Sequence, residues 1–350
     1  MPRKTENEFD IVRIADDAVR VTGYHGGPEA VLPDEIDGMK VREIGREAFA
    51  GQTGLKSLIL PEGLMSIHTG AFAGCVGLRS VRLPASVTAI AEGAFVRCVN
   101  LAEIDADPEN EVYRTLDGVL FDRRGKTLLC YPAGRPEPLY ELPISVSVIA
   151  SQAFSWCPAL QDVIMPPGLS WIGEGAFSYC VLLRSAELPR GLLGIGARAF
   201  MGCGRLKAIR MPGSLTELGE EAFSGCGQLS EVTFPCLLTH LENGVFRDCA
   251  SLPVMELTEG LTEIGDTAFS GCRALTAINL PVGLERIGDE AFRNCSSLRQ
   301  LEIPAGVSRV GYGAFSGCKR LTVITGKGSA ADLAAKRDKV RRRTFGRRIK

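Results

Sequence analysis

The feature that most constrains this chain is a 23-residue repeat. Phe recurs at that interval, apart from one step of 59 residues between Phe95 and Phe154. The full series is Phe49, Phe72, Phe95, Phe154, Phe177, Phe200, Phe223, Phe246, Phe269, Phe292 and Phe315. A unit of this length cannot bury an apolar face alone, whereas stacked copies can bury a continuous core. The repeat therefore predicts a solenoid.

One unit shows how each repeat should fold. Ile278 and Leu280 alternate with polar residues, which predicts a short strand that ends at Pro281. A second short extended segment follows and ends at Gly288, and the sequence DEAFRNC after it has the spacing of one helical turn. We therefore expect an α/β repeat of short parallel strands and one-turn helices, with about twelve coils.

The repeated motif I-G-x-x-A-F-x-x-C-x-x-L, followed by I-x-L-P, resembles the BspA-type leucine-rich repeat, a class found in bacterial and protist proteins. This resemblance implies a leucine-rich-repeat solenoid and a role in protein binding, adhesion or host contact. It supplies no catalytic residues. It also implies the domain organisation: an N-terminal cap and opening repeat (1–45), a repeat array (46–326) with a β-hairpin insertion at about 107–142, and a C-terminal helical cap with a basic tail (327–350).

Ten cysteines follow the Phe series at a distance of three residues. Stacked coils would hold their thiols in parallel, which is the wrong geometry for disulfides. The chain has no C-x-x-C pair for zinc and only three His that could act as a base for a nucleophilic thiol. We expect the cysteines to be small buried hydrophobic residues, and we expect no metal or cofactor. Unpaired thiols favour a reducing, cytoplasmic location; a secreted or cell-surface location is the alternative.

Charge separates the C-terminus from the rest of the chain. The whole chain has 40 Lys and Arg against 41 Asp and Glu, but the segment from Lys327 on has ten basic residues against two Asp. Ser329 is a candidate N-cap for a short helix there. The basic segment, which includes Arg341, Arg342 and Arg343, could serve as a cap alone, or bind an acidic partner, a membrane surface or nucleic acid. No apolar run is long enough to span a membrane.

The sequence contains no P-loop, G-x-S-x-G, H-E-x-x-H or EF-hand motif, so we expect no enzyme activity and no small-molecule substrate. Acidic residues recur before several Phe residues, at Glu220–Glu221, Asp266 and Asp289–Glu290. Stacked coils would align them into a stripe, which we interpret as a solvated face rather than a calcium site.

Residues that depart from the repeat indicate the binding surface. The columns beside the buried strand residue should line the sheet face, and they include Arg82, Glu187 and Arg210. Trp156 and Tyr179 occupy a site two residues after Phe, where other repeats favour Gly, Asn or Asp, as a left-handed conformation requires. With Trp171 they could form an exposed aromatic patch, or they could pack against the hairpin.

The sequence is compatible with three functions. The first is a non-enzymatic scaffold for protein–protein interaction that uses these surfaces. The first alternative is a secreted or cell-surface adhesin whose leader has been removed. The second alternative is binding of nucleic acid or an acidic partner through the Arg-rich C-terminus, which is less favoured because the net charge of −1 does not favour a polyanion.

Overall fold

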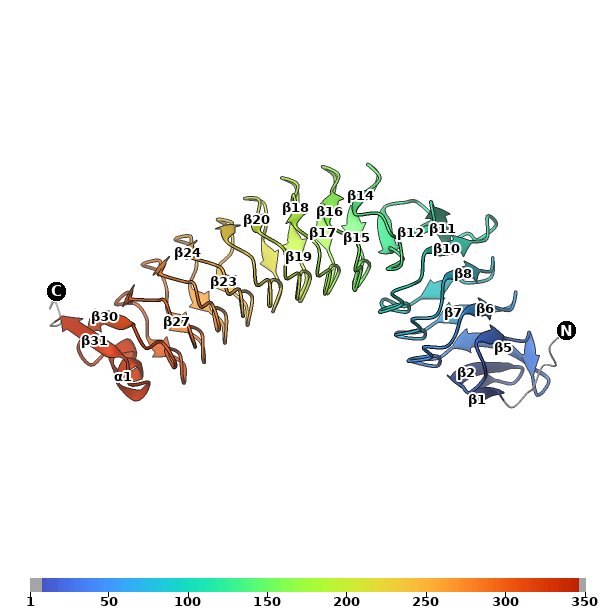
Figure 1. The fold of residues 1–350 in the computed structure, drawn as a ribbon, viewed down its shortest axis with the longest axis horizontal. Coiled ribbons are helices and arrows are strands. Elements are labelled where there is room, and N and C mark those ends of the chain that lie inside the picture. The colour runs from blue at the N-terminus through green and yellow to red at the C-terminus, as the bar shows by residue number, and fades with distance from the viewer. Residues whose placement is uncertain (1–7, 346–350) are drawn as a thin grey trace. The chain divides into compact units, whose positions relative to one another are not determined.

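The computed structural model describes residues 8–345. The chain forms two compact units. Unit 1 comprises the chain up to Pro138 together with Ser145–Leu160, and unit 2 comprises Leu139–Ile144 together with the chain from Gln161 on. Within each unit successive coils lie side by side (Figure 1). Most coils have two short strands, which pair in parallel with the equivalent strands of neighbouring coils. The fold is a parallel-strand solenoid of about 14 turns with a period of about 23 residues.

The first strand of each coil, which we call the leading strand, ends near the repeat's proline. Its central residue points inward and its flanking residues point outward, as in Ala208–Arg210, because side chains alternate along a strand. Leading strands of unit 1 are β3 (Glu29–Val31), β6 (Ser57–Ile59), β8 (Ser80–Leu83) and β10 (Glu103–Ala106). Leading strands of unit 2 are β14 (Leu139–Glu141), β16 (Asp162–Ile164), β18 (Ser185–Ala186), β20 (Ala208–Arg210), β22 (Glu231–Thr233), β24 (Val254–Glu256), β26 (Ala277–Asn279), β28 (Gln300–Glu302) and β30 (Thr322–Gly326).

The second strand of each coil, the trailing strand, is usually two residues long and precedes the turn that carries Phe. Trailing strands of unit 1 are β5 (Met39–Ile44), β7 (Ser66–Ile67), β9 (Ala89–Ile90) and β15 (Val148–Ile149). Trailing strands of unit 2 are β17 (Trp171–Ile172), β19 (Gly194–Ile195), β21 (Glu217–Leu218), β23 (His240–Leu241), β25 (Glu263–Ile264), β27 (Arg286–Ile287) and β29 (Arg309–Val310). In most coils the paired residues of neighbouring coils are 23 positions apart, as His240 and Glu263 are.

The predicted one-turn helices are wrong. The segments around each Phe are turns, and α1 (Ala330–Arg337) is the one α-helix within residues 8–345. The residues two before and two after Phe269, Thr267 and Gly271, both have positive φ, and every Phe of the series shows this pattern. A left-handed residue stops a right-handed helix. The turn amides instead donate to the next coil, as Phe177 N does to the Ala199 carbonyl at 2.7 Å.

Stacked aromatic rings run through the core of both units. Neighbouring Phe rings of unit 2 have centroids 5.1–6.3 Å apart and lie within 14° of parallel. In unit 1, Tyr24 and Tyr131 take the place of Phe and stack on Phe49 and Phe154 at 5.0 and 4.9 Å. The Phe series has eleven members and shows neither of these tyrosine coils, so the estimate of about twelve coils was too low.

None of the twelve cysteines forms a disulfide, and all are buried except the half-buried Cys130 and the exposed Cys236. In eight coils the thiol donates to the carbonyl of the Phe in the preceding coil, over 2.9–3.2 Å and an offset of 26 residues. Burial raises the pKa of the Cys75, Cys226 and Cys272 thiols to about 12. The thiols therefore pack and donate in their protonated form, as the sequence predicted.

The interruption after Phe95 contains an antiparallel hairpin, formed by β11 (Tyr113–Leu116) and β12 (Val119–Asp122). A third strand, β13 (Thr127–Cys130), pairs antiparallel to β12 and parallel to β15. The hairpin therefore returns the chain to the repeat, and β13 serves as the trailing strand of the Tyr131 coil.

Other elements stand at the two ends of the chain. The antiparallel strands β1 (Phe9–Ala15) and β2 (Ala18–Tyr24) precede the first coils, with β4 (Glu35–Ile36) paired to β5. After β30, Ser329 accepts a hydrogen bond from Asp332 N as the N-cap of α1, as expected. Strand β31 (Arg341–Phe345) then pairs parallel to β30. Residues 1–7 of the predicted N-terminal cap and 346–350 of the predicted tail lie outside the described residues.

Candidate functional site

A hollow on the strand faces of unit 2 lies over three adjacent leading strands, β14, β16 and β18. Leu139 on β14 and Ile164 on β16 are 50% and 48% exposed, which is unusual for large aliphatic residues. They line a groove of about 800 Å³, which we call the leading-strand groove. Its other principal lining residues are Asp162, Met165, Pro167, Glu187, Leu188, Pro189 and Arg190.

Fixed charges border this apolar floor. Asp162 accepts hydrogen bonds from Ser185 Oγ at 2.7 Å and from Arg184 Nη2 at 2.8 Å. Burial opposes ionisation of Asp162, but these two donors outweigh it and hold the pKa of the carboxyl below its usual value. An apolar centre with a charged border is the general anatomy of a protein–protein interface.

The structure places the three predicted sheet-face residues at different positions. Glu187, just after β18, lines the leading-strand groove. Arg210 on β20 is exposed and lies 3.7 Å from Glu231. Arg82 on β8 belongs to unit 1 and forms an ion pair with Asp107 at 3.2 Å. Glu187 is therefore the one member of this set that lies in a groove.

The predicted aromatic residues occupy separate settings. Trp156 and Tyr179 have φ values of 62° and 60°, which confirms the left-handed site. In unit 1 the Arg97 guanidinium lies 4.4 Å from the Trp156 ring centroid, a cation–π contact. In unit 2, Tyr179 lies on a turn and its ring covers Gly202, whereas Trp171 lies on β17 and its ring covers Gly194.

The basic C-terminal segment is a strand rather than an irregular tail. Arg341, Arg342 and Arg343 lie on β31, where main-chain pairing with β30 orders them. Arg342 Nη1 forms a 2.7 Å ion pair with Asp332 on α1. Both contacts attach β31 to the last coil, in agreement with a capping role.

The acidic stripe has a structural role that the sequence did not suggest. Asn243 Oδ1 accepts from Asp266 N at 2.8 Å, Asp266 Oδ1 from Asp289 N at 2.7 Å, and Asp289 Oδ1 from Tyr312 N at 2.7 Å. Each side chain thus binds the backbone of the next coil, although Asn243 and Asp289 are exposed and Asp266 is only half-buried. Within residues 8–345, no group of three or more His, Cys, Asp or Glu residues is placed to hold a metal ion.

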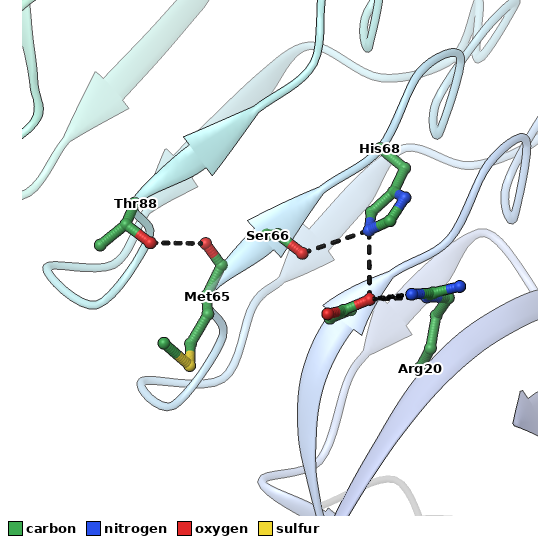
Figure 2. A network of polar contacts seen from close by, with 6 residues as sticks. Arg20, Met65, Ser66, His68 and Thr88 are labelled. Atoms are coloured by element: carbon green, nitrogen blue, oxygen red, sulfur yellow. Dashed lines mark hydrogen bonds and ion pairs between the residues drawn. The ribbon is translucent and has the colours of Figure 1, made fainter. Parts of the chain in front are cut away.

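His68 of unit 1 takes part in a polar network that superficially suggests catalysis (Figure 2). Its Nε2 lies 3.3 Å from Ser66 Oγ and 3.1 Å from Glu43 Oε2, and Glu43 also binds Arg20 at 2.6 Å. A catalytic triad needs the hydroxyl and the carboxylate on opposite ring nitrogens. Here both contact the same nitrogen, so the network lacks the geometry of a triad and instead links strands β2, β5 and β7.

Comparison with known proteins agrees with this architecture. The model of the BspA type leucine rich repeat region matches six copies, over residues 35–117, 139–253 and 242–335. These ranges cover most of the sequence. The chain belongs to the BspA-type leucine-rich repeat family.

One solved structure shows the same fold at low sequence identity, and two others are similar to this chain with lower TM-scores. A leucine-rich repeat protein from Eubacterium ventriosum has a TM-score of 0.58 and 19% identity, over 89% of this chain and 93% of that one. One from Bacteroides ovatus has a TM-score of 0.45 and 24% identity, over 98% and 99%. A leucine-rich cell surface protein from Faecalibacterium prausnitzii has a TM-score of 0.49 and 20% identity, over 100% and 96%. No curated protein matches the sequence.

Membership of the BspA-type family explains the repeat but does not select a site. Within the described residues, no helix is long and apolar enough to cross a membrane.

Sequence reasoning missed Leu139, although it lies one period before Asp162 and belongs to the same outward-facing column. It also missed the residues beside Trp171, because their grouping requires the register of the trailing strands.

Proposed function

We propose that this BspA-type repeat protein is a non-enzymatic scaffold that binds another protein through the leading-strand groove. The observation that carries the proposal is the pair of exposed aliphatic residues, Leu139 and Ile164, in a groove with charged borders. Removing such apolar surface from water is favourable by about 25 cal/mol per Å², and part of this gain offsets the entropy cost of association. Asp162, Glu187 and Arg190 would orient the partner.

Affinity purification from the native host tests this proposal with a matched pair of variants. Ile164→Glu puts a charge on the groove floor. Val254→Glu makes the same change on β24, at a residue that is also 48% exposed but does not line the groove. We expect the wild type and Val254→Glu to recover the same partner, and Ile164→Glu to recover at least tenfold less. Equal recovery by all three would refute the proposed surface.

The thiols no longer favour a cytoplasmic location over a secreted or cell-surface one. Eight of the ten repeat cysteines are fully inaccessible and Cys157 and Cys318 are 1% exposed, so an oxidising medium would have little access to them. Protease treatment of intact host cells separates the two alternatives. A surface adhesin would be digested, whereas a cytoplasmic protein would survive until the cells are lysed.

The C-terminal Arg residues support nucleic-acid binding less well. Arg342 is already paired with Asp332, and β31 has a sufficient role in covering the last coil. If a polyanion did bind there, its affinity would fall steeply with salt concentration.

A further inference from the structure

A second groove lies on the trailing strands of unit 2, beside Trp171. Trp171 on β17 pairs with Gly194 on β19, and Gly194 is buried beneath the indole ring. A Cβ atom at position 194 would overlap that ring, so only glycine lets the indole lie across the neighbouring coil. The ring therefore forms a wall that other coils of this unit lack.

The hollow next to this wall has a volume of about 430 Å³, and we call it the trailing-strand groove. Besides Trp171, its polar lining comprises Thr216, Glu217, Glu220, Thr239, His240 and Glu242. Three carboxylates thus face one groove, and neither Lys nor Arg is among its lining residues. The groove is acidic with one aromatic wall.

Arg198 and Arg247, on the turns that follow β19 and β23, are paired with other carboxylates. Arg198 binds Glu221 at 2.8 Å and lies 3.6 Å from Glu174. Arg247 lies 3.6 Å from Asp248 and 4.0 Å from Glu221. Glu220 is also engaged, because it accepts a hydrogen bond from Asn243 Nδ2 at 3.0 Å.

Glu217 and Glu242 differ from these carboxylates. Across residues 8–345, neither takes part in an ion pair. The same column shows the contrast two coils further on, where Glu263 faces Arg286 in the register and forms a 2.8 Å ion pair with it. The neighbours of Glu217 in this column are Gly194 and His240, so no Lys or Arg stands beside it.

We propose that the trailing-strand groove binds a Lys or Arg side chain of a protein partner. The cation would lie against the Trp171 ring, which attracts it through its π face, and Glu217 and Glu242 would balance its charge. A neutral ligand such as a sugar would hydrogen-bond these carboxylates without neutralising their charge, and an anion would be repelled. The inference rests on the proposed scaffold function and adds the chemistry of the partner.

The test uses the full chain and two short capped peptides. The first is Gly-Lys-Gly-Arg-Gly, and the second replaces Lys with norleucine and Arg with citrulline, which removes both charges. Binding is located by the indole N–H resonance of Trp171 in ¹⁵N-labelled protein, assigned with Trp156→Phe, since the chain has two Trp. We expect a saturable shift with the basic peptide and none with the neutral one.

Variants test the roles of the residues by fluorescence anisotropy of the labelled basic peptide. Glu217→Gln with Glu242→Gln should weaken binding at least tenfold. Glu256→Gln with Glu302→Gln makes the same charge change at exposed leading-strand positions outside the groove and should leave affinity within twofold. Trp171→Leu should weaken binding roughly two- to fivefold.

Three results would overturn the inference: equal binding of the neutral peptide, an equal loss in both double variants, or a Trp171 shift with a neutral disaccharide but not with the basic peptide. The proposed function is tested separately. A partner that still depends on Ile164 when the basic peptide fails to bind would leave the scaffold function standing and remove this inference alone.

Discussion

At the scale of single residues, the stack is held by polar contacts that repeat at an offset of about one coil. The thiol of Cys249 donates to the Phe223 carbonyl, which also accepts from Cys226 N of its own coil. Both lone pairs of that buried carbonyl are therefore used. A cysteine suits this position because it fills an apolar site and still provides a weak donor.

The sequence predicted that these cysteines are buried and unbonded, because their spacing fits neither disulfides nor zinc. It did not predict the acceptor, since a 26-residue contact depends on how one coil lies on the next. The same limit applies to the acidic stripe. Asp266 lies on a turn and is half-buried, and its bond to the backbone of the following coil could not be predicted without knowledge of the stacking.

Asp266 provides a test of this side-chain ladder. Asp266→Ala removes the acceptor for Asp289 N and should lower the free energy of unfolding by about 1 kcal/mol. Asp266→Asn keeps Oδ1 and should stay close to wild type, since Asn243 makes the equivalent bond one coil earlier. Denaturant titration compares the two variants, and an equal loss in both would show that charge rather than the acceptor matters.

At the scale of elements, the turns around Phe decide the secondary structure. Gly, Asn and Asp two residues after Phe are visible in the sequence and indicate left-handed backbone. The matching left-handed site two residues before Phe is hidden, because residues such as Glu47, Gln152 and Arg198 occupy it. Because the sequence reveals only one of the two left-handed sites, the residues around Phe retain the spacing of a helical turn, and the prediction of one-turn helices was wrong.

Thr267 tests the strain at the hidden site. It has φ of 54°, whereas the equivalent positions in the preceding coil and two coils later are Gly244 and Gly313. Thr267→Gly removes about 1–2 kcal/mol of left-handed strain and adds about 0.5–1 kcal/mol of backbone entropy cost, so unfolding should cost about 0.5–1 kcal/mol more. Thr233→Gly on β22 should instead destabilise. A loss of stability in Thr267→Gly, measured by denaturant titration, would contradict this reasoning.

The leading-strand groove was partly predictable. Alternation along each strand identifies outward residues such as Ile164 and Glu187. The interruption of the Phe series concealed the coil before them, although Leu139 and Tyr131 lie 23 residues before Asp162 and Phe154. Counting the period backwards through the interruption would have found both residues. That these outward residues enclose a hollow depends on the stacked structure itself.

At the scale of the whole molecule, the effects of the buried thiols add together. In the unfolded chain a thiol has a pKa near 9.0, while burial raises the pKa of Cys75, Cys226 and Cys272 to about 12 in the folded state. The folded state therefore holds more protons between these values. Its stability is complete below pH 9 and falls as pH rises toward 12.

Each such thiol should cost about 1.4 kcal/mol per pH unit above pH 9. We expect the thermal unfolding midpoint to fall steeply between pH 9 and pH 10.5. A Cys226→Ala, Cys272→Ala variant should start from a lower midpoint at pH 7 but show a shallower fall. Parallel curves for the variant and the wild type would show that the buried thiols do not cause the alkaline loss.

Different positions of the repeat maintain the stack and form the proposed binding surfaces. Its repeated interior, made of ring columns and protonated thiols, maintains the stack, and departures from the repeat create grooves on the strand faces. Membership of the BspA-type family accounts for the repeated interior. The grooves are particular to this chain, because Leu139, Ile164 and Trp171 depart from the repeat pattern.

Hydrogen–deuterium exchange of the full chain, alone and with the partner recovered from the native host, tests the central claim most directly. We predict slower exchange at residues 139–141, 162–167 and 185–191, which form the leading-strand groove, and unchanged exchange in the turns around Phe. Slower exchange confined to 341–345, or to the Phe-bearing turns, would contradict the account.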